Sequence, residues 1–157
     1  NMEYGIALTA GTFDPVTYGH LDIIKRAADM CAVLIVGIFE NPDKKPLFPL
    51  EKRYEALCAA TMEIENAVVI TNSGMLYEYA KEAGADVIIK GVRSESDRVY
   101  EQKQADFNYQ HSGIKTVLLE ADPKYKDVSS TLVRKLISEG KSVSRYVPKD
   151  ALRVLSE

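Results

Sequence analysis

Apolar residues recur along the chain in five short runs, each with the length of a β-strand. The runs span residues 4–10, 32–39, 67–71, 86–91 and 114–120. They are rich in Val and Ile and read as nearly continuous apolar stretches, not as an alternation of apolar and polar positions. Continuous apolar runs are typical of parallel strands that are covered on both faces of a sheet.

Segments with helical patterning separate these runs. They span residues 20–30, 50–62, 75–84 and 97–111, and two more follow the fifth run at 128–140 and 146–155. Strands that alternate with helices predict a parallel sheet joined by right-handed crossovers. The sequence therefore predicts an α/β fold, with a single doubly wound, Rossmann-like domain around a five-stranded parallel sheet.

The composition adds limits to this picture. The 157 residues, 46% of them hydrophobic and 27% charged, fit one globular domain, which we place at residues 2–157. Asn1 precedes Met2 and is expected to be an added residue. The net charge of −3 gives no general field for polyanions, so we expect neither nucleic acid nor a membrane as a partner.

Cysteine usage and the N-terminal residues indicate a cellular compartment. Cys31 and Cys58 have no histidine nearby at ligand spacing, so we expect free thiols and no metal-ligand set. The N-terminal residues show no signal peptide, and no apolar run has the length of a bilayer span. These observations predict a cytoplasmic protein.

The most informative segment is AGTFDPVTYGH, residues 10–20, directly after the first predicted strand. Ligands of doubly wound sheets bind beyond the carboxyl ends of the strands. Gly11 would let a phosphate approach the backbone, Asp14 and Pro15 would form a turn, and the helix start that follows favours an anion. That helix start also favours a neutral His20 that donates a hydrogen bond. The alternative interpretation of this histidine is an ordinary helix cap.

A dinucleotide site is not favoured, because the chain lacks GxGxxG and offers only Glu40 near the end of the second run. Instead, GTFDPVTYGH resembles the first signature of the nucleotidyltransferase superfamily of α/β phosphodiesterases, (T/H)xGH, in its Thr form at residues 17–20. The longer pattern GTFDPxTxGH is similar to the phosphopantetheine adenylyltransferase family. Nicotinate-nucleotide adenylyltransferases and cytidylyltransferases usually show HxGH.

The loop after the second run reads ENPDKKPLFPLEKR, residues 40–53. Pro42 and Pro46 enclose two lysines in a stiff turn, from which Lys44 can reach a phosphate as a mobile point charge. A solvated basic loop is the alternative. The pattern NPxKKPLFxxExR is similar to the substrate loop of the family, and the resemblance matches Lys44 to its phosphate-binding lysine.

The loop after the fourth run begins KGVRSESDRVYE, residues 90–101, and places cations at a strand end. The guanidinium fork of Arg93 suits a triphosphate. The segment is similar to the family pattern RGLRxxxDxEYExxxAxxN, but Lys90 stands in place of the usual Arg, and Arg98 and Val99 in place of an aromatic–acid pair. These departures leave the identity of the acceptor open.

The last loop, DVSSTLVRKL at residues 127–136, is similar to the second superfamily signature, ISSTxxR. Hydroxyls and backbone N–H groups at this helix start would bind the β- and γ-phosphates. Ordinary N-capping explains one hydroxyl of this group but not all three. Before it, residues 73–86 resemble the family's pantetheine-facing segment, in which Met75 and Leu76 would contact the substrate, although the sequence alone favours core positions for both residues.

The resemblance implies an adenylyl transfer from ATP to 4'-phosphopantetheine that gives dephospho-CoA and pyrophosphate. Its implied ATP-binding residues are Gly11, Thr12, Phe13, His20, Gly91, Val92, Arg93, Glu101, Ser129, Ser130 and Thr131. Its implied substrate-binding residues are Thr12, Lys44, Met75, Leu76 and Lys90. The implied catalytic residues are Thr12, His20, Lys44 and Arg93.

The same resemblance implies Mg²⁺ as a cofactor, held by the phosphates with few protein ligands, and a homohexamer. Two alternatives stay open at this stage. One is a related nucleotidyltransferase with a different phosphate acceptor. The other is a regulator that binds a nucleotide or CoA without turnover.

Overall fold

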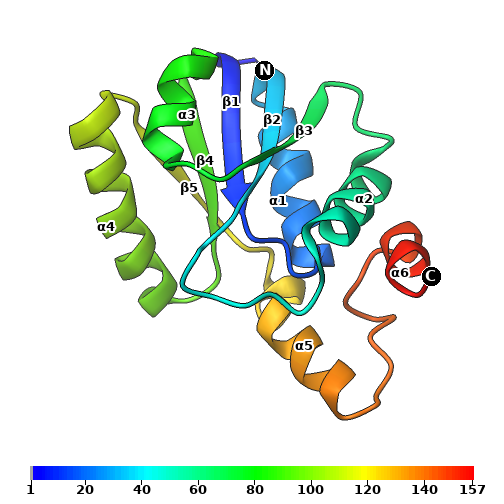
Figure 1. Ribbon diagram of the computed structural model, residues 1–157. Helices are drawn as coiled ribbons and strands as arrows, with labels where there is room; N and C mark the ends of the chain where they lie inside the picture. Colours follow the sequence, from blue (N-terminus) through cyan, green and yellow to red (C-terminus); the bar gives the residue numbers. More distant parts are fainter. Residues whose placement is uncertain (1) are drawn as a thin grey trace.

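The computed structural model describes residues 2–157, so the prediction about Asn1 lies outside the described residues. A five-stranded parallel sheet with the order β3-β2-β1-β4-β5 forms its centre (Figure 1). The strands are β1 (Tyr4–Gly11), β2 (Cys31–Phe39), β3 (Ala67–Asn72), β4 (Val87–Val92) and β5 (Thr116–Glu120). The predicted α/β class with a five-stranded parallel sheet is confirmed.

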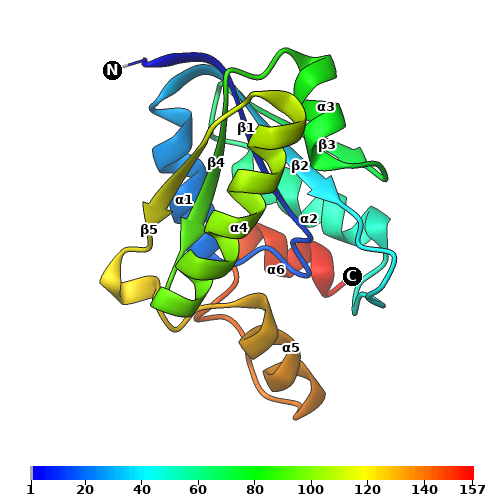
Figure 2. The ribbon, with the colours of Figure 1, turned by 90° about the vertical axis from the view of Figure 1, so that its left-hand side faces the viewer.

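Helices cover both faces of the sheet (Figures 1 and 2). They are α1 (Tyr18–Ala28), α2 (Leu50–Thr61), α3 (Leu76–Ala83), α4 (Glu95–Ser112), α5 (Ser130–Ser138) and α6 (Lys149–Leu155), with a short 3-10 turn η1 at Pro123–Tyr125. The sheet has a hydrophobic core on each face, a larger one beneath α1 and α2 and a smaller one beneath α3. Adjacent residues of β1 point to opposite faces, so that Ala7 packs in the larger core and Leu8 in the smaller one. Within residues 2–157, no helix combines the length and the apolar character that a membrane span requires.

The strand order changes direction between β1 and β4. Two register pairs join these strands, Ala7 with Val87 and Leu8 with Ile88. By contrast, seven pairs join β1 to β2. The loops that follow β1 and β4 leave this seam toward different sides, and such a point is where doubly wound sheets bind their ligands.

Candidate active site

A cavity of about 330 Å³ opens at this switch point. Its walls come from the loop after β1, the start of α1, the end of β4, the start of α4 and the start of α5. Most of the predicted site residues line it: Gly11, Thr12, Phe13, His20, Lys90, Gly91, Val92, Arg93, Glu101, Ser129, Ser130 and Thr131. The structure thus brings three segments that lie far apart in the sequence, within residues 9–24, 90–101 and 121–134, to one place.

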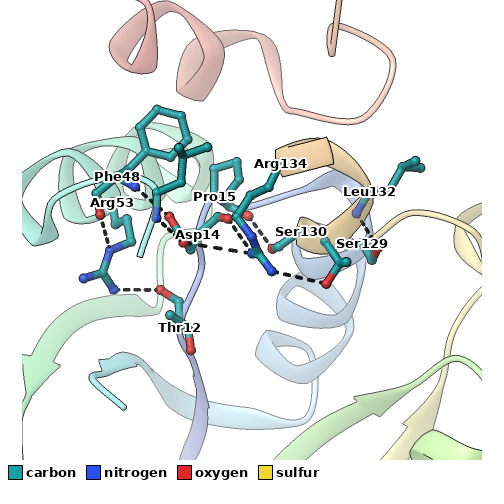
Figure 3. A network of polar contacts seen from close by, with 11 residues as sticks. Thr12, Asp14, Pro15, Phe48, Arg53, Ser129, Ser130, Leu132 and Arg134 are labelled. Atoms are coloured by element: carbon teal, nitrogen blue, oxygen red, sulfur yellow. Dashed lines mark hydrogen bonds and ion pairs between the residues drawn. The ribbon is translucent and has the colours of Figure 1, made fainter. Parts of the chain in front are cut away.

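The carbonyl groups of the loop after β1 are held from behind by side chains of α2 and α5 (Figure 3). Three carbonyl oxygens accept hydrogen bonds, at residues 12, 14 and 15. The donors are Arg53 Nη1 at 3.1 Å, Arg134 Nη1 at 2.9 Å and Ser130 Oγ at 2.7 Å, respectively. Within residues 2–157, the N–H groups of Phe13 and Asp14 have no protein acceptor. They remain available to an anion.

Phe13 shapes this loop from the inside. Its φ of 49° lies in the left-handed region, which a residue with a side chain adopts at a cost of roughly 1–3 kcal/mol. The ring is 4% exposed and belongs to the larger core. It also meets the His20 ring edge-on, with the ring centroids 5.0 Å apart. Phe13 therefore fixes both the course of the loop and the plane of the imidazole.

His20 is both a helix cap and a wall of the cavity, so the two interpretations of the sequence hold together. Its Nδ1 accepts the N–H of Thr17 at 3.0 Å, and Thr17 Oγ1 accepts the N–H of His20 at 3.2 Å. This reciprocal pair is a capping box at the start of α1. Because Nδ1 acts as an acceptor, the proton of the neutral ring resides on Nε2.

The environment keeps this ring neutral. Burial away from water, together with the smaller effects of the positive charges of Lys90 and Arg93, lowers the pKa of His20 to about 4. We had expected a neutral ring from the helix N-terminus, and the larger cause proves to be desolvation. Near neutral pH, His20 is thus a donor through Nε2–H.

The two cations of the β4 loop are anchored by backbone carbonyls and carboxylates. Lys90 Nζ donates to the carbonyl of Ala10 at 3.0 Å, across the seam between β4 and β1, and lies 3.8 Å from Glu101 Oε1. Arg93 Nη1 donates to the carbonyl of Lys126 at 3.3 Å. These contacts hold both positive charges at the cavity wall.

The three hydroxyls at the start of α5 all have protein partners. Ser129 Oγ accepts the N–H of Leu132 at 3.1 Å, as an N-cap does. Thr131 Oγ1 accepts from Arg134 Nη2 at 3.2 Å, and Ser130 Oγ is committed to the β1 loop as described above. In the described chain, the backbone N–H groups of residues 130 and 131 have no acceptor from the protein. They are the free donors at this helix start.

A second cavity, of about 300 Å³, lies beside the first one, under the loop between β2 and α2. The two cavities share Thr12, Asp14 and Arg134 as lining residues. Lys44 lines only the second cavity, and its ammonium group has no ion-pair partner within residues 2–157. Thr12 therefore lies between the first cavity and a second cavity of similar size that two lysines of the loop, Lys44 and Lys45, also line.

The predicted pair Met75 and Leu76 lies elsewhere. Met75, the residue before α3, is 46% exposed, and Leu76 packs against the smaller core beneath α3. Neither residue lines the two cavities. The core position that the sequence favoured for both residues agrees with the packing of Leu76 and is wrong for the exposed Met75. A substrate role for the pair stays a prediction.

Several charged residues of the site were missed, among them Arg134 and two that are almost fully buried. Asp14, interpreted as part of a turn, is 4% exposed, and Arg53 is 2% exposed. The sequence does contain a signal that Arg53 is buried. Ala56 and Leu57 follow it by three and four residues, so Arg53 lies on the apolar face of α2. An arginine on such a face needs polar partners inside the fold.

Comparisons with known proteins agree with this geometry. The cytidylyltransferase-like family model matches residues 8–136. A phosphopantetheine adenylyltransferase of Caldanaerobacter subterraneus is 44% identical over 144 residues, which covers 91% of this chain and 90% of the relative. One from Thermobifida fusca is 42% identical over 138 residues, which covers 88% of this chain and 84% of the relative.

Among solved structures, a candidate nicotinate-nucleotide adenylyltransferase from Vibrio parahaemolyticus has a TM-score of 0.71 at 16% identity, over 96% of this chain and 91% of that one. At this identity the likeness concerns the fold alone. The relatives that share the sequence are more specific, and from them it follows that this chain belongs to the phosphopantetheine adenylyltransferase family, within the cytidylyltransferase-like group.

Proposed function

We propose that the protein transfers the adenylyl group of ATP to 4'-phosphopantetheine, giving dephospho-CoA and pyrophosphate. The relatives named phosphopantetheine adenylyltransferase support this reaction. The observation that carries the proposal is the pair of adjoining cavities, with a neutral imidazole in the first, a lysine in the second and Thr12 between them. Such a pair suits two phosphate groups that must meet.

The reaction needs no protein nucleophile. An oxygen of the acceptor phosphate attacks the α-phosphorus of ATP, the new P–O bond forms, and the bond from the α-phosphorus to the bridging oxygen breaks to release pyrophosphate. Catalysis then consists of positioning and charge stabilisation. In our proposal, His20 Nε2–H donates to an α-phosphate oxygen, where negative charge develops.

The remaining residues divide between the acceptor and the leaving group. Lys44 in the second cavity and Lys90 in the wall of the first would place the acceptor phosphate next to Thr12, where the two cavities meet. Arg93 and the free N–H groups at the start of α5 would hold the pyrophosphate, because a helix N-terminus and a guanidinium both favour phosphate oxygens. The Ser130 hydroxyl would contribute through its hold on the loop after β1, and the Ser129 hydroxyl through its cap on α5.

The proposal includes Mg²⁺, brought in on the phosphates of ATP. Within residues 2–157, no group of three or more His, Cys, Asp or Glu side chains converges on a metal position. The carboxylate of Glu101 in the first cavity already faces Lys90. These side chains therefore do not form a protein-held magnesium site, and when bound the ion would neutralise phosphate charge.

The cytoplasmic location and the homohexamer implied by the resemblance are further parts of this proposal. Sedimentation of the purified protein at several concentrations tests the assembly. A hexamer predicts one species of about six chain masses, or roughly 105 kDa by simple multiplication of the 17.5 kDa chain.

The decisive experiment measures pyrophosphate release from ATP with three acceptors: 4'-phosphopantetheine, nicotinate mononucleotide and glycerol phosphate. We expect the highest kcat/KM with phosphopantetheine. A higher value with another acceptor would assign the chain a different substrate and leave the ATP cavity standing. No release with any acceptor, from a folded protein that binds ATP, would favour the non-catalytic regulator.

A further inference from the structure

The backbone of Phe48, in the loop that carries Lys44, is held at both of its polar groups (Figure 3). The carboxylate of Asp14 accepts the N–H of Phe48 at 3.0 Å and the N–H of Leu47 at 2.8 Å. From the other side, Arg53 Nε donates to the carbonyl of Phe48 at 2.9 Å. The end of the lysine loop is thus attached to two side chains of the protein interior.

The same two side chains also connect to the loop after β1. Arg53 Nη1 donates to the carbonyl of Thr12, and Asp14 is itself part of that loop. Two hydrogen bonds therefore join Asp14 directly to residues 47–48, and two more join Thr12 to Phe48 through the side chain of Arg53. We call this set of contacts, made by Asp14 and Arg53, the loop clamp.

The lysine side of the clamp is short and stiff. Pro46 fixes the backbone directly before Leu47, and the N–H of Lys44 donates to the carbonyl of Asn41 at 3.1 Å. Between the clamp and Lys44 there is consequently little freedom. Movement of residues 47–48 away from Asp14 would carry the lysine with it, away from Thr12.

Charge burial shows that the clamp is a specific arrangement. An ionised side chain loses its hydration on burial, and the loss is offset only where hydrogen bonds of good geometry replace the water. Asp14 and Arg53 meet this condition mainly through backbone groups of the two loops. If the loops separated, both charges would be left with fewer partners inside the protein, so the structure favours the joined state.

We propose that Asp14 and Arg53 are positioning residues for the acceptor: they hold Lys44 at a fixed place relative to Thr12 and thereby set the affinity for the acceptor phosphate. This inference rests on the proposed function for the assignment of the second cavity to the acceptor. Neither residue takes part in bond making in this scheme. ATP would occupy the first cavity, which Asp14 also lines, but there the loop after β1 keeps the anchors that Ser130 and Arg134 provide.

The kinetic test uses Asp14→Asn, which keeps the size of the side chain but replaces one acceptor oxygen by an NH₂ group that cannot accept. We expect the KM for phosphopantetheine to rise about tenfold or more, with the KM for ATP within about twofold of wild type. The matched control is Asp86→Asn, because Asp86 accepts the N–H of Ile6 at 2.9 Å near the amino ends of β1 and β4, the ends opposite the cavities. The control should retain both KM values.

A double variant separates positioning from general damage. If Asp14 acts through Lys44, Asp14→Asn should add little to the rise in acceptor KM that Lys44→Ala alone produces. Multiplicative effects of the two changes, or equal rises in both KM values, would overturn the proposal. Where Asp14→Asn does not fold, Arg53→Lys opens the clamp from its other side and carries the same expectations.

Hydrogen exchange tests the clamp without turnover. The amide protons of Leu47 and Phe48 should be protected in the wild-type protein and exchange about tenfold faster or more in Asp14→Asn, while Asp86→Asn leaves them protected. Fast exchange in wild type would refute the clamp itself. Because this readout needs no substrate, an enzyme inactive with phosphopantetheine but with a protected loop would refute the proposed function and not the clamp.

Discussion

Acidification should destabilise the protein through His20, and the structure gives both the sign and the size of the effect. The pKa of His20 falls from 6.5 to about 4 on folding, chiefly through burial. Between these two values the unfolded chain binds a proton that the folded chain does not bind. Stability is therefore lost as the pH falls from about 6.5 toward about 4, and the loss levels off below that range.

The magnitude follows from proton linkage. The fall from 6.5 to about 4 corresponds to about 3.4 kcal/mol of unfolding free energy when the whole pH range between these values has been crossed. At about pH 5 most of the unfolded chains carry the proton on this histidine, whereas few folded molecules do. We expect His20 alone to cost about 2 kcal/mol of unfolding free energy between about pH 7.5 and about pH 5.

Urea unfolding of wild type and His20→Asn at the two pH values measures this cost. Loss of the helix cap lowers the stability of the variant at both pH values, so only the change with pH is compared. The free energy of unfolding should fall by about 2 kcal/mol more in wild type than in the variant. Equal falls in the two proteins would show that the imidazole is not desolvated as described.

Three further predictions concern turnover. His20→Ala should lower kcat by about 10²- to 10³-fold with little change in ATP binding, because the donor acts mainly in the transition state; a kcat within about threefold of wild type would leave His20 as a helix cap only. Lys44→Ala should raise the KM for phosphopantetheine far more than that for ATP, and equal rises in steady-state assays would refute the assignment of its loop. Lys90→Arg should keep or improve the KM for phosphopantetheine, since a guanidinium can form two parallel hydrogen bonds with a phosphate; a large loss of kcat/KM for this acceptor alone would indicate that Lys90 is adapted to a different one.

The sheet was predictable because each of its strands is a nearly continuous run of apolar residues. The runs at 32–39 and 67–71 match β2 and β3 to within one residue at each end. Helix starts were harder to place. We expected the first helix from residue 20, but it begins at Tyr18, because Thr17 supplies the cap. The turn η1 was not predicted, and its three residues are too few for a periodic pattern.

The site was predictable as a set of loops but not as a set of contacts. Local patterns placed His20 at a helix start and Lys90 and Arg93 at a strand end, and the fold brings them to one cavity. The partner of Ser130, by contrast, is a carbonyl 115 positions earlier in the chain. No periodicity or local motif encodes such a pairing. The same is true of the aspartate whose acceptor role depends on backbone amides 33 and 34 positions away.

The short seam between β1 and β4 has a mechanical consequence. Strands β1 to β3 and strands β4 and β5 form the two flanks of the sheet, and only two register pairs join the strands of one flank to those of the other. A nucleotide bound in the first cavity would touch both flanks and act as a brace across their weakest joint. Under a pulling force applied to the two flanks, the empty protein should therefore part at this seam first, and ATP should raise the force required.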